Sequence, residues 1–101
     1  MVDEARIRGL AERHTYEHKG IRYRIALWRL RFDPMLETGI EPRAVDLDFT
    51  ATPFAGGDVV RLSLHLSVES AEDDVFLLDA IDNTIQKIID GDLPPGAREL
   101  L

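Results

Sequence analysis

The alternation of apolar and polar residues predicts three long β-strands in the middle of the chain. Residues 21–32 (IRYRIALWRLRF) alternate apolar side chains with arginines, and residues 44–52 and 59–68 alternate apolar with polar or charged side chains. A two-residue period is typical of a strand with one buried face. A Gly-Gly-Asp turn signal separates the last two strands and predicts a hairpin. A brief strand at 15–17 would pair back on the first long strand.

Helical periodicity predicts one helix on each side of these strands. Residues 3–13 place Ile7 and Ala11 on one face, with Asp3 as the N-cap. A longer helix is expected to begin after Ser70 as its cap and to end at Gly91. Its apolar stripe consists of Leu77, Leu78, Ile81, Ile85, Ile88 and Ile89.

Together these elements predict a single α+β domain over residues 1–101 with the order α-β-β-β-α. We expect a three-stranded antiparallel sheet, or a four-stranded one if residues 15–17 join it. The long C-terminal helix and the short N-terminal helix should cover one face, because a two-layer domain has one core. Residues 93–101 are expected to form a flexible tail or a short docked turn.

The alternation in residues 21–32 changes phase near the middle, between Leu27 and Trp28. A β-bulge near Ala26–Trp28 would restore the phase and place all apolar residues, including Trp28, on the core side. The arginines would then form one stripe on the other face. The alternative is a strand whose second half is buried on both faces. Without the bulge, Trp28 joins Arg22 and Arg24 on the outer face, which would then resemble a subunit contact.

The distribution of charge restricts the classes of partner. The chain of 101 residues has a formal net charge of −7, and residues 69–101 hold nine acidic residues against Lys87 and Arg98. Such a surface repels phosphate backbones, so nucleic acid is not an expected partner. The order of elements is also that of the double-stranded-RNA-binding domain. That family places lysines at the start of its last helix, whereas this chain has Glu72, Asp73 and Asp74 there.

The outer sheet face supplies the candidate interaction residues, which are Arg22, Arg24, Arg29, Arg31, Arg61 and His65. Asp46 and Asp48 share this face if the first two long strands are neighbours. Cross-strand ion pairs on a solvated face, worth roughly 0.2–1 kcal/mol each, are the simpler interpretation. Binding of an anion or a protein partner is the functional one.

The three histidines form no recognised catalytic or metal-binding pattern. His14 and His18 flank Glu17, and His65 lies between Ser63 and Ser67, but neither spacing is that of a known ligand set or of a nucleophile and its base. The chain has no cysteine, which excludes disulfides and thiolate ligands. The sequence therefore predicts no catalytic, cofactor-binding or metal residue.

We expect a small non-enzymatic interaction or assembly module that binds a protein partner or itself, as a homodimer, through the outer sheet face. The alternative is a small-molecule-binding domain or small enzyme with a pocket between the sheet and the loop at 33–43. A weaker alternative is RNA binding by the arginine-bearing strand. The charged start is not typical of a signal peptide, and no apolar run approaches the roughly 20 residues of a membrane span. We therefore expect a cytoplasmic protein without membrane contact.

Overall fold

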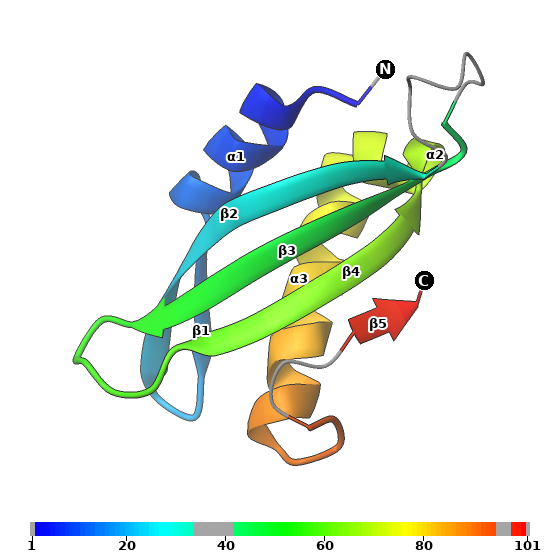
Figure 1. Ribbon diagram of the computed structural model, residues 1–101. Coiled ribbons are helices and arrows are strands. Elements are labelled where there is room, and N and C mark those ends of the chain that lie inside the picture. Colours follow the sequence, from blue (N-terminus) through cyan, green and yellow to red (C-terminus); the bar gives the residue numbers. More distant parts are fainter. Residues whose placement is uncertain (1, 34–41, 95–97, 101) are drawn as a thin grey trace.

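One curved sheet with helices on a single side makes up the structure, a computed structural model that describes residues 2–33, 42–94 and 98–100 (Figure 1). The strands lie in the order β1-β2-β3-β4-β5, the first four antiparallel and β5 parallel to β4. The α+β class, the antiparallel sheet and the optional fourth strand are confirmed. In chain order the elements are α1 (Glu4–Arg13), β1 (Thr15–His18), β2 (Ile21–Asp33), β3 (Ala44–Pro53), β4 (Val60–Ser67), α2 (Val68–Glu72), α3 (Asp74–Ile89) and β5 (Arg98–Leu100).

The sequence missed β5, because it left this region as a tail or a docked turn. Arg98–Leu100 pairs in parallel with residues 63–65 of β4. A three-residue strand is too short to give a periodic signal, and its partner lies more than thirty positions earlier in the chain. Residues 34–41 of the predicted loop lie outside the described residues.

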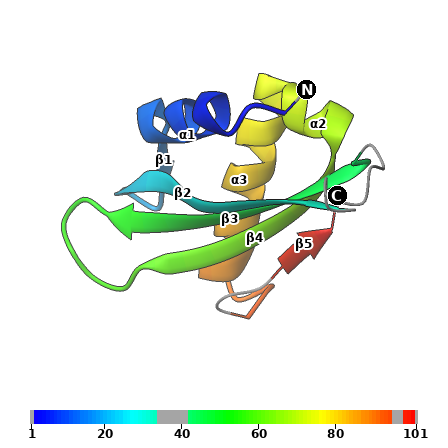
Figure 2. The same cartoon turned by 45° about the horizontal axis from the view of Figure 1, so that its top comes forward.

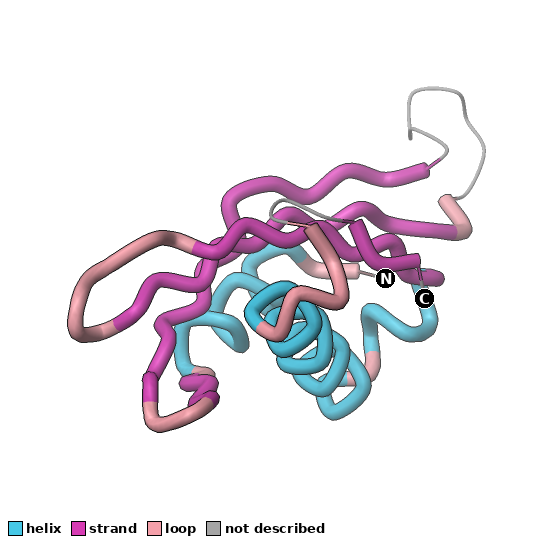
Figure 3. The backbone as a smooth tube through the Cα atoms, turned by 90° about the horizontal axis from the view of Figure 1, so that it is seen from below, coloured by secondary structure: helices cyan, strands magenta, loops and turns pink. Residues whose placement is uncertain are grey.

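The inner face of the sheet and the helices share one hydrophobic core. Phe49 at the centre of β3 is fully buried, as are its cross-strand partners, Leu27 of β2 and Leu62 of β4. α1 contributes Ile7 and Ala11, which are one turn apart, and α3 contributes Leu77 and Ile81 at the equivalent spacing. Figures 2 and 3 show the described helices on this side of the sheet, so the opposite sheet face has no helix over it within the described residues.

A β-bulge in β2 accounts for the change of phase. Leu27 pairs with Phe49 and Arg29 pairs with Asp48, so Trp28 is the extra residue, and the predicted bulge is confirmed. The expectation that the bulge turns Trp28 into the core is wrong, because this side chain is 53% exposed. At a bulge two residues oppose one, and the extra residue does not follow the alternation of its strand.

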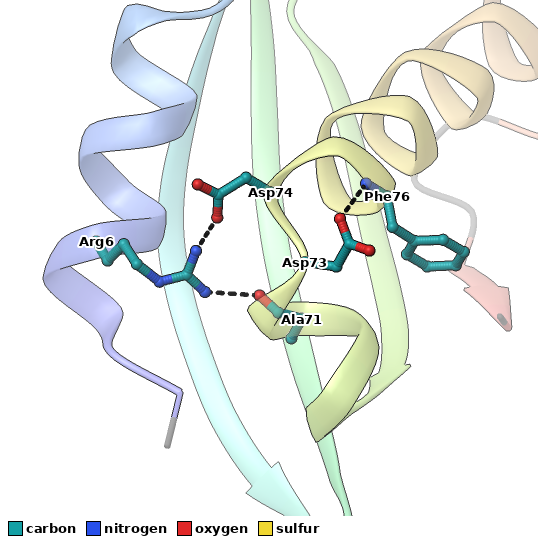
Figure 4. Close-up of polar contacts among 5 residues, drawn as sticks. All are labelled: Arg6, Ala71, Asp73, Asp74 and Phe76. Atoms are coloured by element: carbon teal, nitrogen blue, oxygen red, sulfur yellow. Dashed lines mark hydrogen bonds and ion pairs between the residues drawn. The ribbon is translucent and has the colours of Figure 1, made fainter.

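The C-terminal helical region consists of two helices rather than one. Ser67, not Ser70, caps α2, and its hydroxyl accepts the Ser70 backbone N–H. Asp73 has extended backbone angles between the helices and caps α3 by accepting the Phe76 N–H (Figure 4). A capping aspartate satisfies a free N–H group at a helix start, so Asp73 both ends α2 and begins α3.

Candidate interaction surface

The sheet face opposite the helices, which we call the outer face, is the basic side of an acidic protein. Its five arginines outnumber its three carboxylates among the side chains that the structure describes in β1 to β4, whereas the whole chain has a formal net charge of −7. The bulge keeps the arginines in phase, and all six predicted interaction residues lie on this face. Its charged and aromatic members are Glu17, Arg22, Arg24, Trp28, Arg29, Arg31, Asp46, Asp48, Arg61 and His65.

A polar network at the centre of the outer face joins three strands. The Arg29 Nε donates to Asp48 Oδ2 at 2.6 Å, and the Ser63 hydroxyl donates to Asp48 Oδ1. Asp48 is only 5% exposed although it lies on the outer face, which none of the described helices covers. A buried carboxylate is costly unless charged or polar donors satisfy it, and Arg29 and Ser63 are those donors. The network therefore fixes the position of Arg29.

Trp28 is held against this network. The Arg29 guanidinium carbon lies 4.8 Å from the centroid of the Trp28 ring, within the range of a cation–π contact. Because Asp48 fixes Arg29, the indole has a defined orientation while half of its surface stays in contact with solvent. An exposed aromatic side chain held in one orientation loses little conformational entropy when a partner covers it.

A shallow hollow of about 260 Å³ lies beside the indole and is lined by Trp28, Thr50 and Arg61. Thr50 and Arg61 pair across β3 and β4, so the hollow spans the middle of the outer face. Its volume is below the range of about 300–1,000 Å³ that is usual for small-molecule pockets. The Trp28 hollow has the size for one inserted side chain of a partner.

The outer face continues toward the hairpin that joins β3 to β4. There the Arg24 guanidinium carbon lies 5.1 Å from the centroid of the Phe54 ring, and Phe54 is 54% exposed. Arg22 pairs across strands with Glu17 at 3.3 Å, with both side chains more than half exposed. Two exposed aromatic rings, each contacted by an arginine, therefore lie on or beside the same face.

His65 pairs with a carboxylate on the outer face. Its Nδ1 lies 2.7 Å from Asp46 Oδ1 across β4 and β3. A histidine held by a carboxylate is also the arrangement of a catalytic base. The neighbouring Ser63 hydroxyl, however, donates a hydrogen bond to Asp48. The structure therefore pairs His65 with Asp46 and Ser63 with Asp48 across strands.

The other two histidines attach the β1 region to α3 on the inner side of the sheet. His14 Nε2 lies 2.8 Å from Asp82, and His18 Nε2 lies 2.9 Å from Asp90, which Lys19 also contacts at 3.1 Å. Burial raises the pKa of Asp82, against the lowering effect of its hydrogen bond with His14. The hydrogen bonds from His18 and Lys19 lower the pKa of Asp90. The described residues include no cluster of three histidine or acidic side chains that could hold a metal ion.

Comparisons with known proteins identify no relative. No protein-family profile matches the chain, and no match was found among the curated proteins or among the solved structures. Within residues 2–33, 42–94 and 98–100, none of the helices combines the length and the apolar character needed to cross a membrane. Any function must therefore be argued from the geometry of the outer face.

The sequence predicted the arginines of the outer face, and Asp46 and Asp48 beside them, but not the network that joins Arg29, Asp48 and Ser63. The part played by Ser63 and Thr50 has no sequence signal, because it depends on which strands are neighbours. Trp28 was recognised, but its direction depends on the position of the bulge to within one residue. The alternative pocket beside the 33–43 loop involves residues 34–41, which lie outside the described residues.

Proposed function

We propose that this protein is a non-enzymatic interaction module that binds an acidic protein surface through its outer face. The observation that carries the proposal is Trp28, which is 53% exposed on the basic outer face and is held in place by Arg29. Tryptophan and arginine are the residues most enriched among those that dominate binding energy at protein interfaces.

The organisation of the face supports a binding function. Asp48 and Ser63 fix Arg29 before any partner arrives, which reduces the entropy cost of association. The Trp28 hollow offers a place for one apolar side chain. Arg61 lines the hollow and Arg24 lies further along the same face, and both side chains are exposed. An apolar pocket bordered by charged side chains is a common arrangement within a protein interface.

The charge of the remaining chain favours a compact acidic partner over a nucleic acid. Charges in physiological salt are screened beyond about 8 Å, so a partner segment that covers only the outer face meets a local positive excess. A long polyanion would also approach the acidic residues of 69–101, which repel it. These considerations support a protein partner and make RNA the competing outcome of the test.

Fluorescence of Trp28, the one tryptophan in the chain, reports directly on the proposed site. The probe is a short random copolymer of glutamate and tyrosine, no longer than the outer face, titrated into the full chain with tryptophan-selective excitation. We expect saturable binding with a blue shift of the emission, since the indole leaves water. Binding should weaken at least about tenfold, or 1.4 kcal/mol, in the double variant Arg24→Glu/Arg61→Glu.

Arg13→Glu is the matched control for Arg61→Glu measured alone, because each reverses one charge and Arg13 is an exposed arginine at the end of α1 and not on the outer face. It should bind the copolymer almost as well as the wild type. An equal loss of affinity in Arg13→Glu would show that the weakening is an effect of net charge alone. Binding of single-stranded RNA in place of the copolymer would overturn the choice of partner.

A further inference from the structure

A second surface of the same chain has the chemistry that the outer face requires. At the start of α3, Val75 is 71% exposed and Phe76 is 40% exposed. Single exposed apolar residues are ordinary, but two adjacent ones of this size at a helix end form a small apolar patch. Figure 4 shows Phe76 projecting from α3 beside the junction of the helices.

Acidic residues surround this patch, which we call the α3 tip. Glu72, Asp73 and Asp74 precede Val75 in the sequence, and Asp79 follows Phe76 by three positions, on the same side of the helix. Glu72 and Asp79 are both exposed. The α3 tip therefore combines apolar side chains with a negative rim.

The backbone that presents the α3 tip is held in place by polar contacts. Asp73 accepts the Phe76 N–H at 3.1 Å, which fixes the first turn of α3. Arg6 of α1 donates to Asp74 and, at 2.8 Å, to the Ala71 carbonyl oxygen, which ties both helices to α1. Like Trp28, the patch is organised in the free chain, so covering it has a small entropy cost.

We propose that the partner of the outer face is a second copy of this chain, whose α3 tip docks at the Trp28 hollow. This inference rests on the proposed function of the outer face. Phe76 of one copy is the side chain placed in the hollow. Glu72 and Asp79 of that copy then lie near the exposed arginines of the receiving outer face, Arg24 and Arg61. The apolar centres and the opposite charges are complementary at the same time, as a specific interface requires.

The position of the two surfaces determines the form of the assembly. The outer face and the α3 tip lie on opposite layers of the molecule, the sheet and the helices (Figures 2 and 3). A contact between two different surfaces is head-to-tail and adds copies in one direction unless a rotation closes the ring. A symmetric dimer through two outer faces would instead bring two positively charged surfaces together, which is unfavourable.

Complementation between two variants tests this contact. Arg24→Glu/Arg61→Glu removes the receiving surface, and Val75→Ser/Phe76→Ser removes the inserting one. Sedimentation velocity of the wild type over about a hundredfold range of concentration should show a mass that rises with concentration. Each variant alone should remain monomeric. Their equimolar mixture should form a one-to-one dimer and stop there, because the two remaining surfaces of that dimer are both inactivated.

Each variant at the total concentration of the mixture serves as the control, and circular dichroism confirms that each is folded. If Val75→Ser/Phe76→Ser does not fold, Asp79→Lys replaces it, since this exposed residue changes only the charge of the rim. Association of Asp79→Lys should then be several-fold weaker than that of the wild type.

The outcomes separate this inference from the proposed function. A wild type that stays monomeric yet binds the glutamate–tyrosine copolymer through Arg24 and Arg61 overturns the self-association and leaves the interaction module intact. If the wild type neither binds the copolymer nor self-associates in sedimentation velocity, both proposals are overturned. Self-association that survives in each variant places the contact elsewhere and also overturns the inference.

Discussion

The coupling between Arg29 and Asp48 is the quantity on which the organised centre of the outer face depends. A double-mutant cycle with Arg29→Met and Asp48→Asn measures it, since methionine keeps the apolar stem and asparagine keeps the shape. Arg29 Nε and Asp48 Oδ2 lie 2.6 Å apart, and the side chains are 45% exposed for Arg29 and 7% exposed for Asp48. The pair is thus intermediate between a surface and a buried ion pair.

The expected coupling free energy follows from this partial burial of the pair. Exposed ion pairs contribute about 0.2–1 kcal/mol, and hydrogen bonds to charged groups about 1.5–3 kcal/mol. With one partner buried and the other half exposed, we expect a coupling free energy of about 1–2 kcal/mol. Urea unfolding of the four proteins, followed by far-ultraviolet circular dichroism, gives the free energies of unfolding that close the cycle.

The Glu17–Arg22 pair provides a matched control on the same face. Its Nε–Oε2 distance is 3.3 Å, and the side chains are 58% and 67% exposed. The cycle of Glu17→Gln and Arg22→Met should give less than about 0.5 kcal/mol. If the Arg29–Asp48 coupling is no larger than this control, the centre of the face is not fixed before binding, and the argument from preorganisation is refuted.

Four further predictions concern the fold. In urea unfolding between about pH 3 and pH 7, the stability advantage of the wild type over Asp90→Asn should grow as the pH rises through the lowered pKa of Asp90, below its ordinary 3.8. The advantage over Asp82→Asn should instead shrink as the pH rises through the raised pKa of Asp82, because ionisation of this partly buried carboxyl opposes folding. Phe49→Ala should lower the free energy of unfolding by about 3–5 kcal/mol, because the ring is fully buried at the centre of β3. Deletion of Trp28 should leave a folded sheet by circular dichroism, since the deletion removes the bulge and leaves the pairing on both sides in register.

Periodicity was sufficient to predict the sheet but not the direction of its one irregular residue. The alternation in β2, interrupted once, required an extra residue, and the structure contains it. The residue that departs from the alternation is set by the pairing of Arg29 with Asp48 on β3. The sequence of β2 alone does not determine this pairing. The tryptophan assigned to the core therefore became the centre of the candidate surface.

Competing local signals explain the other differences. Ser67, Ser70 and Asp73 are all good N-cap residues within seven positions, and the structure uses the first and the last of them. The sequence could not rank them, because the choice depends on where β4 ends against β3. The pairing of β5 with β4 likewise joins distant segments and has no local signal.

Hydroxyl-radical footprinting with mass spectrometry tests the central claim most directly. The chain is labelled at a concentration where it is monomeric, with and without the glutamate–tyrosine copolymer, and oxidation is compared at Trp28 and at Phe76. Both side chains are exposed in the free chain, at 53% and 40%. The account predicts that the copolymer protects Trp28 and leaves Phe76 as reactive as before. Unchanged oxidation of Trp28, or protection of Phe76 alone, would contradict the assignment of the outer face as the binding surface.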